Sequence, residues 1–292
     1  MCAAMTSPTT PPAPPVPRPP SETFIALNPE ALLALAGPLA LELDTVHVWA
    51  FELDGSTELV ERCRNCLSSG ERQRADRFVF ERDRVHHTVA HGVLRHLLGL
   101  YCGISPESLG FSVTAAGKPS LARLPENPAE GSSGNPAGDP PGIHFNLTHS
   151  GGRALLGVSQ GRELGIDLEQ VRSNIEVLSI SRNYFFGAER DAIEGALSVT
   201  RDSLFFRYWV AKEAVLKAQG IGLGFPLDQF RVDFLPGDAE ARIETFDPGR
   251  LDGGWTVRML PCDAGWLAAV AARGQDWVVK VERPVVTDLP HL

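Results

Sequence analysis

The sequence contains no long apolar run, no excess of positive charge and no cysteine pattern of a disulfide framework. Its apolar stretch Trp266–Ala272 is far too short to cross a bilayer. Residues 1–20 carry no apolar core, so we expect no secretory signal there. The net charge of −9 argues against general nucleic-acid binding, which favours strongly basic domains, but it leaves room for a local basic pocket. We therefore expect no membrane span and no nucleic-acid partner.

The cysteines are few and odd in number, five in all, which fits a reducing cytoplasm. The segment "CRNC" has the spacing of a zinc or redox motif, but no second CxxC pair accompanies it. Leu59, Cys63, Cys66 and Leu67 recur at i, i+4, i+7 and i+8, as in the apolar stripe of a helix. This spacing favours small core residues over a metal or redox site.

The composition supports a real core, because 43% of the residues are hydrophobic, in a chain long enough for one large or two ordinary domains. Residues 1–22 are rich in Pro, Thr and Ala, and we expect a disordered tail. Residues 126–142 are dense in Gly, Pro and Ser, which predicts a loop insertion.

The order of predicted elements is strand, helices and strands, followed by the same order again. Asp44–Leu53 is predicted as a strand, helical spacing runs to Cys102, and strands resume at "GIHFNLTHS" and continue through "RALLGVS" and "ELGIDLEQV". Helices then extend to Gly220 before strand-like segments return. We expect an α+β fold with two similar halves, residues 23–162 and 163–285, related by a pseudo-two-fold.

The segment "GIDLE" places two carboxylates on one face of a predicted strand. Ile166 and Leu168 point to one side, and Asp167 and Glu169 point to the other. Neighbouring carboxylates repel each other unless a cation lies between them. Oxygen ligands of this kind suit Mg²⁺, whereas a solvent-facing strand edge with ordinary charges is the alternative interpretation.

The helical segment "YWVAKEAVLKAQG" carries charge beside a strongly aromatic flank, "SLFFRYWV". One helical face holds Trp209, Lys212, Glu213, Leu216 and Lys217. A surface salt bridge between Glu213 and Lys217 would explain two of these charges. The aromatic surface instead indicates a largely buried helix, and charges on such a helix usually line a site. Glu213 would then complete the predicted cation site.

Two further segments offer groups that bind phosphate. "AAGKPSL" places Lys118 on a tight Gly-Pro loop, and "NLTHSGG" combines Thr148 and His149 with a glycine pair. Hydroxyl, imidazole and backbone donors of this kind suit a phosphate, although either segment alone is more often just a turn.

The combination "GKP", "NLTHS", "GIDLE" and "WVAKEAVLK", in that order, resembles the 4′-phosphopantetheinyl transferases. It is most similar to the surfactin-synthetase type with two fused halves, and the resemblance covers Asp44 to Val281. It implies transfer of the phosphopantetheine arm of coenzyme A to a serine of an apo carrier protein, with release of 3′,5′-ADP. It also implies Mg²⁺ bound by Asp167, Glu169 and Glu213, with Mn²⁺ able to substitute.

The resemblance further assigns roles around the reacting phosphate. Glu213 would take the serine proton, and Lys217 would neutralise or protonate the leaving phosphate. Coenzyme A would be held by eight residues: Arg74, Thr88, Lys118, Pro119, Thr148, His149, Lys212 and Lys217. Arg72, Arg77 and His86 are alternatives to Arg74 for the 3′-phosphate, because the basic segment aligns only with a gap. Thr148 stands where the family most often has serine and keeps the hydroxyl.

Two other functions are compatible with parts of the pattern. One is a non-catalytic module that binds coenzyme A or a carrier domain, and the other is a Mg²⁺-dependent hydrolase that splits coenzyme A without an acceptor. The acceptor itself is open among acyl and peptidyl carrier proteins of fatty-acid, polyketide and nonribosomal peptide biosynthesis. The resemblance implies a monomer, because two fused halves can form the single active site at their interface, and we expect it in the cytoplasm.

Overall fold

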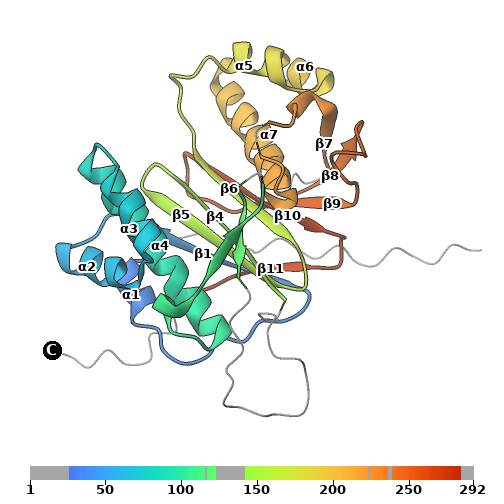
Figure 1. The fold of residues 1–292 in the computed structure, drawn as a ribbon. Coiled ribbons are helices and arrows are strands. Elements are labelled where there is room, and N and C mark those ends of the chain that lie inside the picture. The colour runs from blue at the N-terminus through green and yellow to red at the C-terminus, as the bar shows by residue number, and fades with distance from the viewer. Residues whose placement is uncertain (1–25, 116, 123–141, 223, 236–238, 284–292) are drawn as a thin grey trace, which may run out of the picture.

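The computed structural model describes residues 26–115, 117–122, 142–222, 224–235 and 239–283, and Figure 1 shows them as an α+β fold. The predicted tail, residues 1–22, and residues 126–141 of the predicted insertion lie outside the described residues. The elements up to residue 160 are α1 (Pro29–Leu33), β1 (Thr45–Glu52), α2 (Thr57–Cys66), α3 (Ser69–Asp76), α4 (Glu81–Cys102), η1 (Pro106–Ser108), β2 (Phe111–Val113), β3 (Pro119–Leu121), β4 (Ile143–Ser150) and β5 (Arg153–Gln160). The later elements are β6 (Leu164–Gln170), α5 (Val177–Tyr184), α6 (Gly187–Gly195), α7 (Ser198–Gln219), η2 (Leu227–Gln229), β7 (Phe230–Phe234), β8 (Glu240–Thr245), β9 (Trp255–Leu260), β10 (Trp266–Arg273) and β11 (Val278–Val281).

Two sheets divide the molecule into two sub-domains. The first sheet has the order β11-β1-β5-β4, and the second has the order β6-β10-β9-β8-β7. A 22-residue helix accompanies each sheet, α4 in the first sub-domain and α7 in the second. The predicted α+β class with two sub-domains is confirmed.

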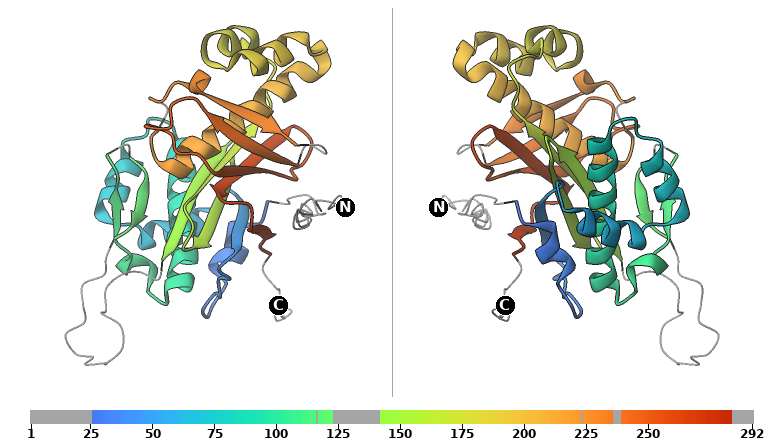
Figure 2. Two further views of the ribbon diagram at one scale, coloured as in Figure 1. Left: turned by 90° about the vertical axis from the view of Figure 1, so that its right-hand side faces the viewer. Right: turned by 90° about the vertical axis from the view of Figure 1, so that its left-hand side faces the viewer.

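The two sheets pack face to face between these helices, as Figure 2 shows from two sides. Along β1, Trp49 and Phe51 join the core under α4, whereas Val46 and Val48 join a core between the sheets. Along β6, the alternation is equally strict, because Leu164, Ile166 and Leu168 all face the core between the sheets. The period of two therefore leaves Asp167 and Glu169 on the opposite face, as predicted, and the structure turns that face toward α7.

The last described strand, β11, returns to the first sheet. It pairs parallel with β1, with Thr45 opposite Val278 and Val48 opposite Val281. The first sheet therefore contains a strand from the end of the chain, and the two sub-domains are joined by this crossing as well as by the core between the sheets.

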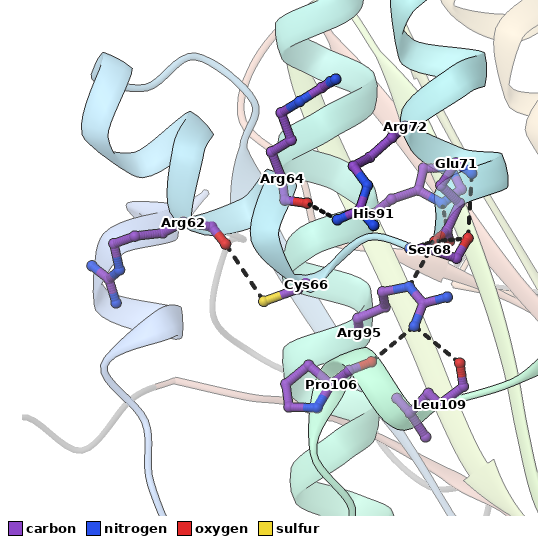
Figure 3. A network of polar contacts seen from close by, with 10 residues as sticks. All are labelled: Arg62, Arg64, Cys66, Ser68, Glu71, Arg72, His91, Arg95, Pro106 and Leu109. Carbon is purple, nitrogen blue, oxygen red and sulfur yellow. Dashed lines mark hydrogen bonds and ion pairs between the residues drawn. The ribbon is translucent and has the colours of Figure 1, made fainter.

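Helix α3 is tied to α4 by the network around Glu71 and Arg95 in Figure 3. Arg95 is buried and donates to the Glu71 carboxylate over 2.7 Å and to the carbonyls of Pro106 and Leu109 over 2.8 and 3.0 Å. Ser68 caps α3 and also donates to Glu71. This network joins α3 and α4 to the segment that follows α4.

The CRNC segment belongs to α2 and has no metal partner among the described residues. Cys63 is buried in the core under α4, where its Cβ packs against Gly92, and burial raises the pKa of its thiol to about 12. Cys66 donates to the carbonyl of Arg62 (Figure 3). The core interpretation is confirmed for Cys63. In the described part of the chain, no helix is long and apolar enough to cross a membrane.

Candidate active site

The edge strands of the two sheets, β4 and β6, meet through side chains. The Asn146 Oδ1 atom accepts from the Ile166 amide over 2.8 Å, and the Ser150 hydroxyl donates to Glu169 over 2.8 Å and accepts from the Gln170 amide. We call this junction the β4–β6 seam. Asn146 and Ser150 are an even number of residues apart, so they lie on the same face of β4. That face makes the contacts with β6.

Helix α7 lies directly on β6 because a glycine permits it. A Cβ atom at Gly165 would lie 2.1 Å from the carbonyl oxygen of Ala214 and 2.2 Å from the amide nitrogen of Ala218. Real Cβ atoms do not approach backbone so closely, so any larger residue would push the helix away. This contact brings Glu213 and Lys217 of α7 down over the seam.

Three elements contribute to one polar cluster at the seam. The Lys217 ammonium of α7 lies 2.5 Å from Asp167 Oδ1 of β6 and 3.1 Å from the Thr148 hydroxyl of β4. The Thr148 hydroxyl in turn donates to Asp167 Oδ1 over 3.2 Å. The structure therefore brings together residues from the predicted segments "NLTHS", "GIDLE" and "WVAKEAVLK".

The Asp167 and Glu213 carboxylates are buried, and each has one oxygen atom without a hydrogen-bond partner among the described residues. Asp167 is 3% exposed, and burial raises its pKa to about 6 although the Lys217 charge opposes the shift. Burial, followed by repulsion from Asp167, raises the pKa of Glu213 to about 7. Among the described residues, Asp167 Oδ2 and Glu213 Oε1 have no hydrogen-bond partner. Buried oxygens of this kind are rare in folded proteins unless something binds them.

These unpartnered oxygens fit a divalent cation. Within the described ranges, no group of three or more His, Cys, Asp or Glu side chains is already arranged as a metal site. The two buried oxygens of Asp167 and Glu213 nevertheless offer hard donors, and the charge of Glu169 contributes to raising both pKa values. A cation at this point would offset the repulsion among the three carboxylates.

His149 occupies the rim of the cluster on the side of α4. The residue is exposed overall, but the protein atoms packed around its imidazole lower its pKa, with smaller contributions in the same direction from the Lys217 charge and from His91 and His86. His86 is itself 2.8 Å from the Asp54 carboxylate. Cationic and imidazole groups from both sub-domains thus border the same rim.

Several residues of the site were not singled out from the sequence. Asn146 and Ser150 alternate with Thr148 along β4, so the period of two was the signal that could have found them. Gly165 gave no such signal, because its role depends on how closely α7 approaches β6.

Arg74 and Thr88 lie on the helices α3 and α4 of the first sub-domain. Arg74 is exposed on α3, and its charge adds to the effect of burial in lowering the pKa of His87 to about 4. Thr88 is buried in α4, and its hydroxyl donates to the Arg84 carbonyl over 2.8 Å. No contact among the described residues joins either of them to the seam cluster.

Lys118 and Pro119 lie at the β2–β3 hairpin. Pro119 begins β3 and pairs with Val113. The Lys118 ammonium donates to the carbonyl of Leu164 over 3.2 Å and to the carbonyl of Ala218. Lys118 therefore reaches the second sub-domain from the first.

The structure turns Lys212 away from the cluster and into the core of the second sub-domain. Its side chain is 0% exposed, and its ammonium lies 2.9 Å from Glu189 and donates to the carbonyls of Leu227 and Phe230 over 2.8 and 2.7 Å. Adjacent helical positions such as Lys212 and Glu213 differ by about 100° in direction, so both cannot face the seam. The Lys212 ammonium uses its donors within the core, so we do not assign Lys212 to coenzyme A binding.

The sequence matches two protein-family models, and the boundary between the two matches lies between β5 and β6. A model described as the 4′-phosphopantetheinyl transferase superfamily matches residues 163–271, and one described as the N-terminal part of 4′-phosphopantetheinyl transferases matches residues 54–160. The 4′-phosphopantetheinyl transferase HetI of Nostoc is 33% identical over 83% of this chain and 93% of its own length. The chain belongs to the 4′-phosphopantetheinyl transferase superfamily.

Other members of the superfamily align over similar lengths. The 4′-phosphopantetheinyl transferase Sfp of Bacillus subtilis is 27% identical over 76% of this chain and 89% of its own length. The human L-aminoadipate-semialdehyde dehydrogenase-phosphopantetheinyl transferase is 29% identical over 78% of this chain and 75% of its own. The family predicted from the four motifs is therefore confirmed.

Proposed function

We propose that this protein transfers the 4′-phosphopantetheine arm of coenzyme A to a serine of an apo carrier protein and releases 3′,5′-ADP. The observation that carries this proposal is the meeting of Lys217, Asp167 and Glu213 at the β4–β6 seam. The chain's membership of the superfamily and the alignment with HetI and Sfp over most of their lengths support it.

The reaction forms a bond between the serine oxygen and the β-phosphorus and breaks the bond from that phosphorus to the leaving 3′,5′-ADP. Such displacements depend on positioning and charge neutralisation. Asp167, Glu169 and Glu213 would hold Mg²⁺, or Mn²⁺ in its place. The bound metal ion supplies neutralisation of the pyrophosphate charge. Lys217 neutralises the leaving phosphate, and Glu213 accepts the serine proton.

The coenzyme A contacts that we propose surround this cluster. The Thr148 hydroxyl and the His149 imidazole bind the pyrophosphate, since both lie beside Lys217. Arg74 and Thr88 belong to the side that we assign to the 3′-phosphate. Pro119 remains assigned to the nucleotide end on the resemblance alone.

The organisation of the chain follows from the same proposal. We assign residues 23–162 and 163–285 to the two halves, related by a pseudo-two-fold, and the break between the family matches supports this division. Both halves contribute to one seam within a single chain, so we propose a monomer. The described cysteines are free thiols, which supports a cytoplasmic location.

The test uses the full chain, coenzyme A, Mg²⁺ and apo carrier proteins of the acyl and peptidyl classes. We expect 3′,5′-ADP to appear only when an apo carrier is present, together with a mass gain of one phosphopantetheine arm on that carrier. Release of 3′,5′-ADP without a carrier would instead indicate a hydrolase. Binding of coenzyme A without release, across all carriers, would indicate a non-catalytic module.

A further inference from the structure

We propose that Lys118 is a positioning residue that holds α7 on β6, and thereby sets the geometry of Glu213 and Lys217. This inference rests on the proposed function, because it concerns the same seam. It differs from the role that the sequence resemblance assigns to Lys118, which is contact with the nucleotide end of coenzyme A.

The β2–β3 hairpin presents Lys118 in a fixed direction. The Thr114 hydroxyl accepts from the Lys118 amide over 3.0 Å, and the Lys118 carbonyl accepts from the Thr114 amide over 2.9 Å. Gly117 supplies the turn with a φ of +85°, which L side chains rarely adopt. The stem of Lys118 then packs against Gly220, where an added Cβ would lie 3.0 Å from Lys118 Cδ. The side chain is therefore ordered along its whole length.

The ammonium joins the two elements that carry the seam cluster. Leu164, the first residue of β6, accepts from it over 3.2 Å, and Ala218, in the last turn of α7, accepts as well. These contacts lie next to Gly165, the residue after Leu164. A Cβ atom at Gly165 would clash with the backbone of Ala214 and Ala218, so α7 packs closely on β6 at this point. One cation thus bridges the helix and the strand at their tightest contact.

The physical chemistry of the helix end favours this arrangement. The last four carbonyls of a helix have no partner within it, and Ala218 supplies one of them. The C-terminal end of a helix also carries partial negative charge, which a cation stabilises. The two carbonyls use two of the three N–H donors of the ammonium, so one donor remains for any other acceptor.

A displacement of α7 would reach the chemistry directly. Glu213 and Lys217 lie on the last turns of α7, immediately before the carbonyl that Lys118 binds. A misplacement of about 1 Å can lower turnover about 100-fold. The proposed pyrophosphate contacts at Thr148 and His149 lie on β4 and do not move with α7. Loss of the Lys118 contacts is therefore expected to reduce kcat while KM for coenzyme A stays nearly constant.

The experiment compares Lys118→Met and Lys118→Gln with Lys280→Met, which removes one lysine charge at a half-exposed side chain of β11. We expect Lys118→Met to lower kcat about tenfold or more, with KM for coenzyme A within about threefold. Lys118→Gln, which keeps an N–H donor, should retain more activity, and Lys280→Met should match the wild type. If Lys118→Met does not fold, Lys118→Gln gives the same comparison.

Hydrogen exchange gives a second readout that does not depend on transfer. The amides of Gly220 and Ile221 both bond to the Leu216 carbonyl at the end of α7. We expect faster exchange over residues 214–222 in Lys118→Met and no change in Lys280→Met. A KM for coenzyme A raised with kcat and exchange unchanged would overturn the inference and assign Lys118 to the nucleotide. A wild type that transfers no arm would refute the proposed function, and exchange would still decide the role of Lys118.

Discussion

The Lys217 ammonium lies 2.5 Å from Asp167 Oδ1, across the seam between α7 and β6. Thr148 completes the contact from β4, so residues from both sub-domains close one cluster. The opposite oxygen of Asp167 and one oxygen of Glu213 have no partner in the described part of the structure. The burial of these carboxylates without partners is energetically unfavourable. A bound cation, together with a pyrophosphate, would offset that cost.

Asp167→Asn is expected to remove activity without weakening the fold. The change deletes a proposed metal ligand, so transfer should fall about 100-fold or more. Burial raises the pKa of Asp167, which means that the ionised carboxylate is unfavourable there in the absence of a ligand. Thermal unfolding should therefore occur at an equal or higher temperature than in the wild type. Asp233→Asn, at an exposed position of β7, is the matched control, and a lower unfolding temperature confined to Asp167→Asn would contradict the expectation.

Gly165→Ala is expected to displace α7 from β6. The new Cβ would meet backbone atoms of Ala214 and Ala218 that cannot move independently, at a cost of about 1–3 kcal/mol of unfolding free energy. Activity should fall together with stability. Gly70→Ala in α3 is the control, because its Cβ meets nothing within 4 Å and alanine favours helix. Urea unfolding of both variants decides the matter, and equal stability of the two would refute the close-contact argument.

The Lys212–Glu189 pair is expected to serve stability and not substrate binding. Glu189 also accepts from the amides of Phe186 and Val232, so the pair joins α6, α7 and β7. Lys212→Met leaves the buried Glu189 carboxylate without its counter-charge and should cost about 3–5 kcal/mol. The double variant with Glu189→Gln should recover part of this loss. An increase in KM for coenzyme A, with unfolding free energy retained, would restore Lys212 to the substrate site.

Glu71 is expected to give the fold a dependence on pH. Burial alone would raise its pKa, but hydrogen bonds from His91 and Ser68 and the charge of Arg95 lower it to about 2 overall. Since this lies below the ordinary value of 4.5, the ionised form stabilises the folded state, and the contribution is lost as pH falls from about 4.5 toward about 2.

Glu71→Gln tests this dependence. At pH 7 the variant should be about 1.5–3 kcal/mol less stable, as expected for hydrogen bonds to a charged group. The difference from the wild type should shrink in denaturant titrations at successively lower pH. A stability difference between wild type and variant that stays constant down to pH 2.5 would show that the network does not depend on the ionised form of Glu71.

The sequence correctly predicted that Asp167 and Glu169 share one face of their strand. A strand has only two faces, and the apolar Ile166 and Leu168 occupy the one that packs in the core. The sequence could not separate Lys212 from Glu213, because the rotation of α7 about its axis is set by the contact at Gly165. The return of β11 to β1 was equally out of reach, since that pairing joins segments more than 200 residues apart and leaves no local pattern. The order of the four motifs, by contrast, was enough to identify the family.

The most direct test of the account is the intact mass of an apo carrier protein after incubation with coenzyme A, Mg²⁺ and this protein. Wild type and Asp167→Asn are compared, each with and without EDTA. We predict a gain of one phosphopantetheine arm with the wild type in Mg²⁺, and none with EDTA or with Asp167→Asn. A full gain with Asp167→Asn would contradict the assignment of the seam as the site of transfer.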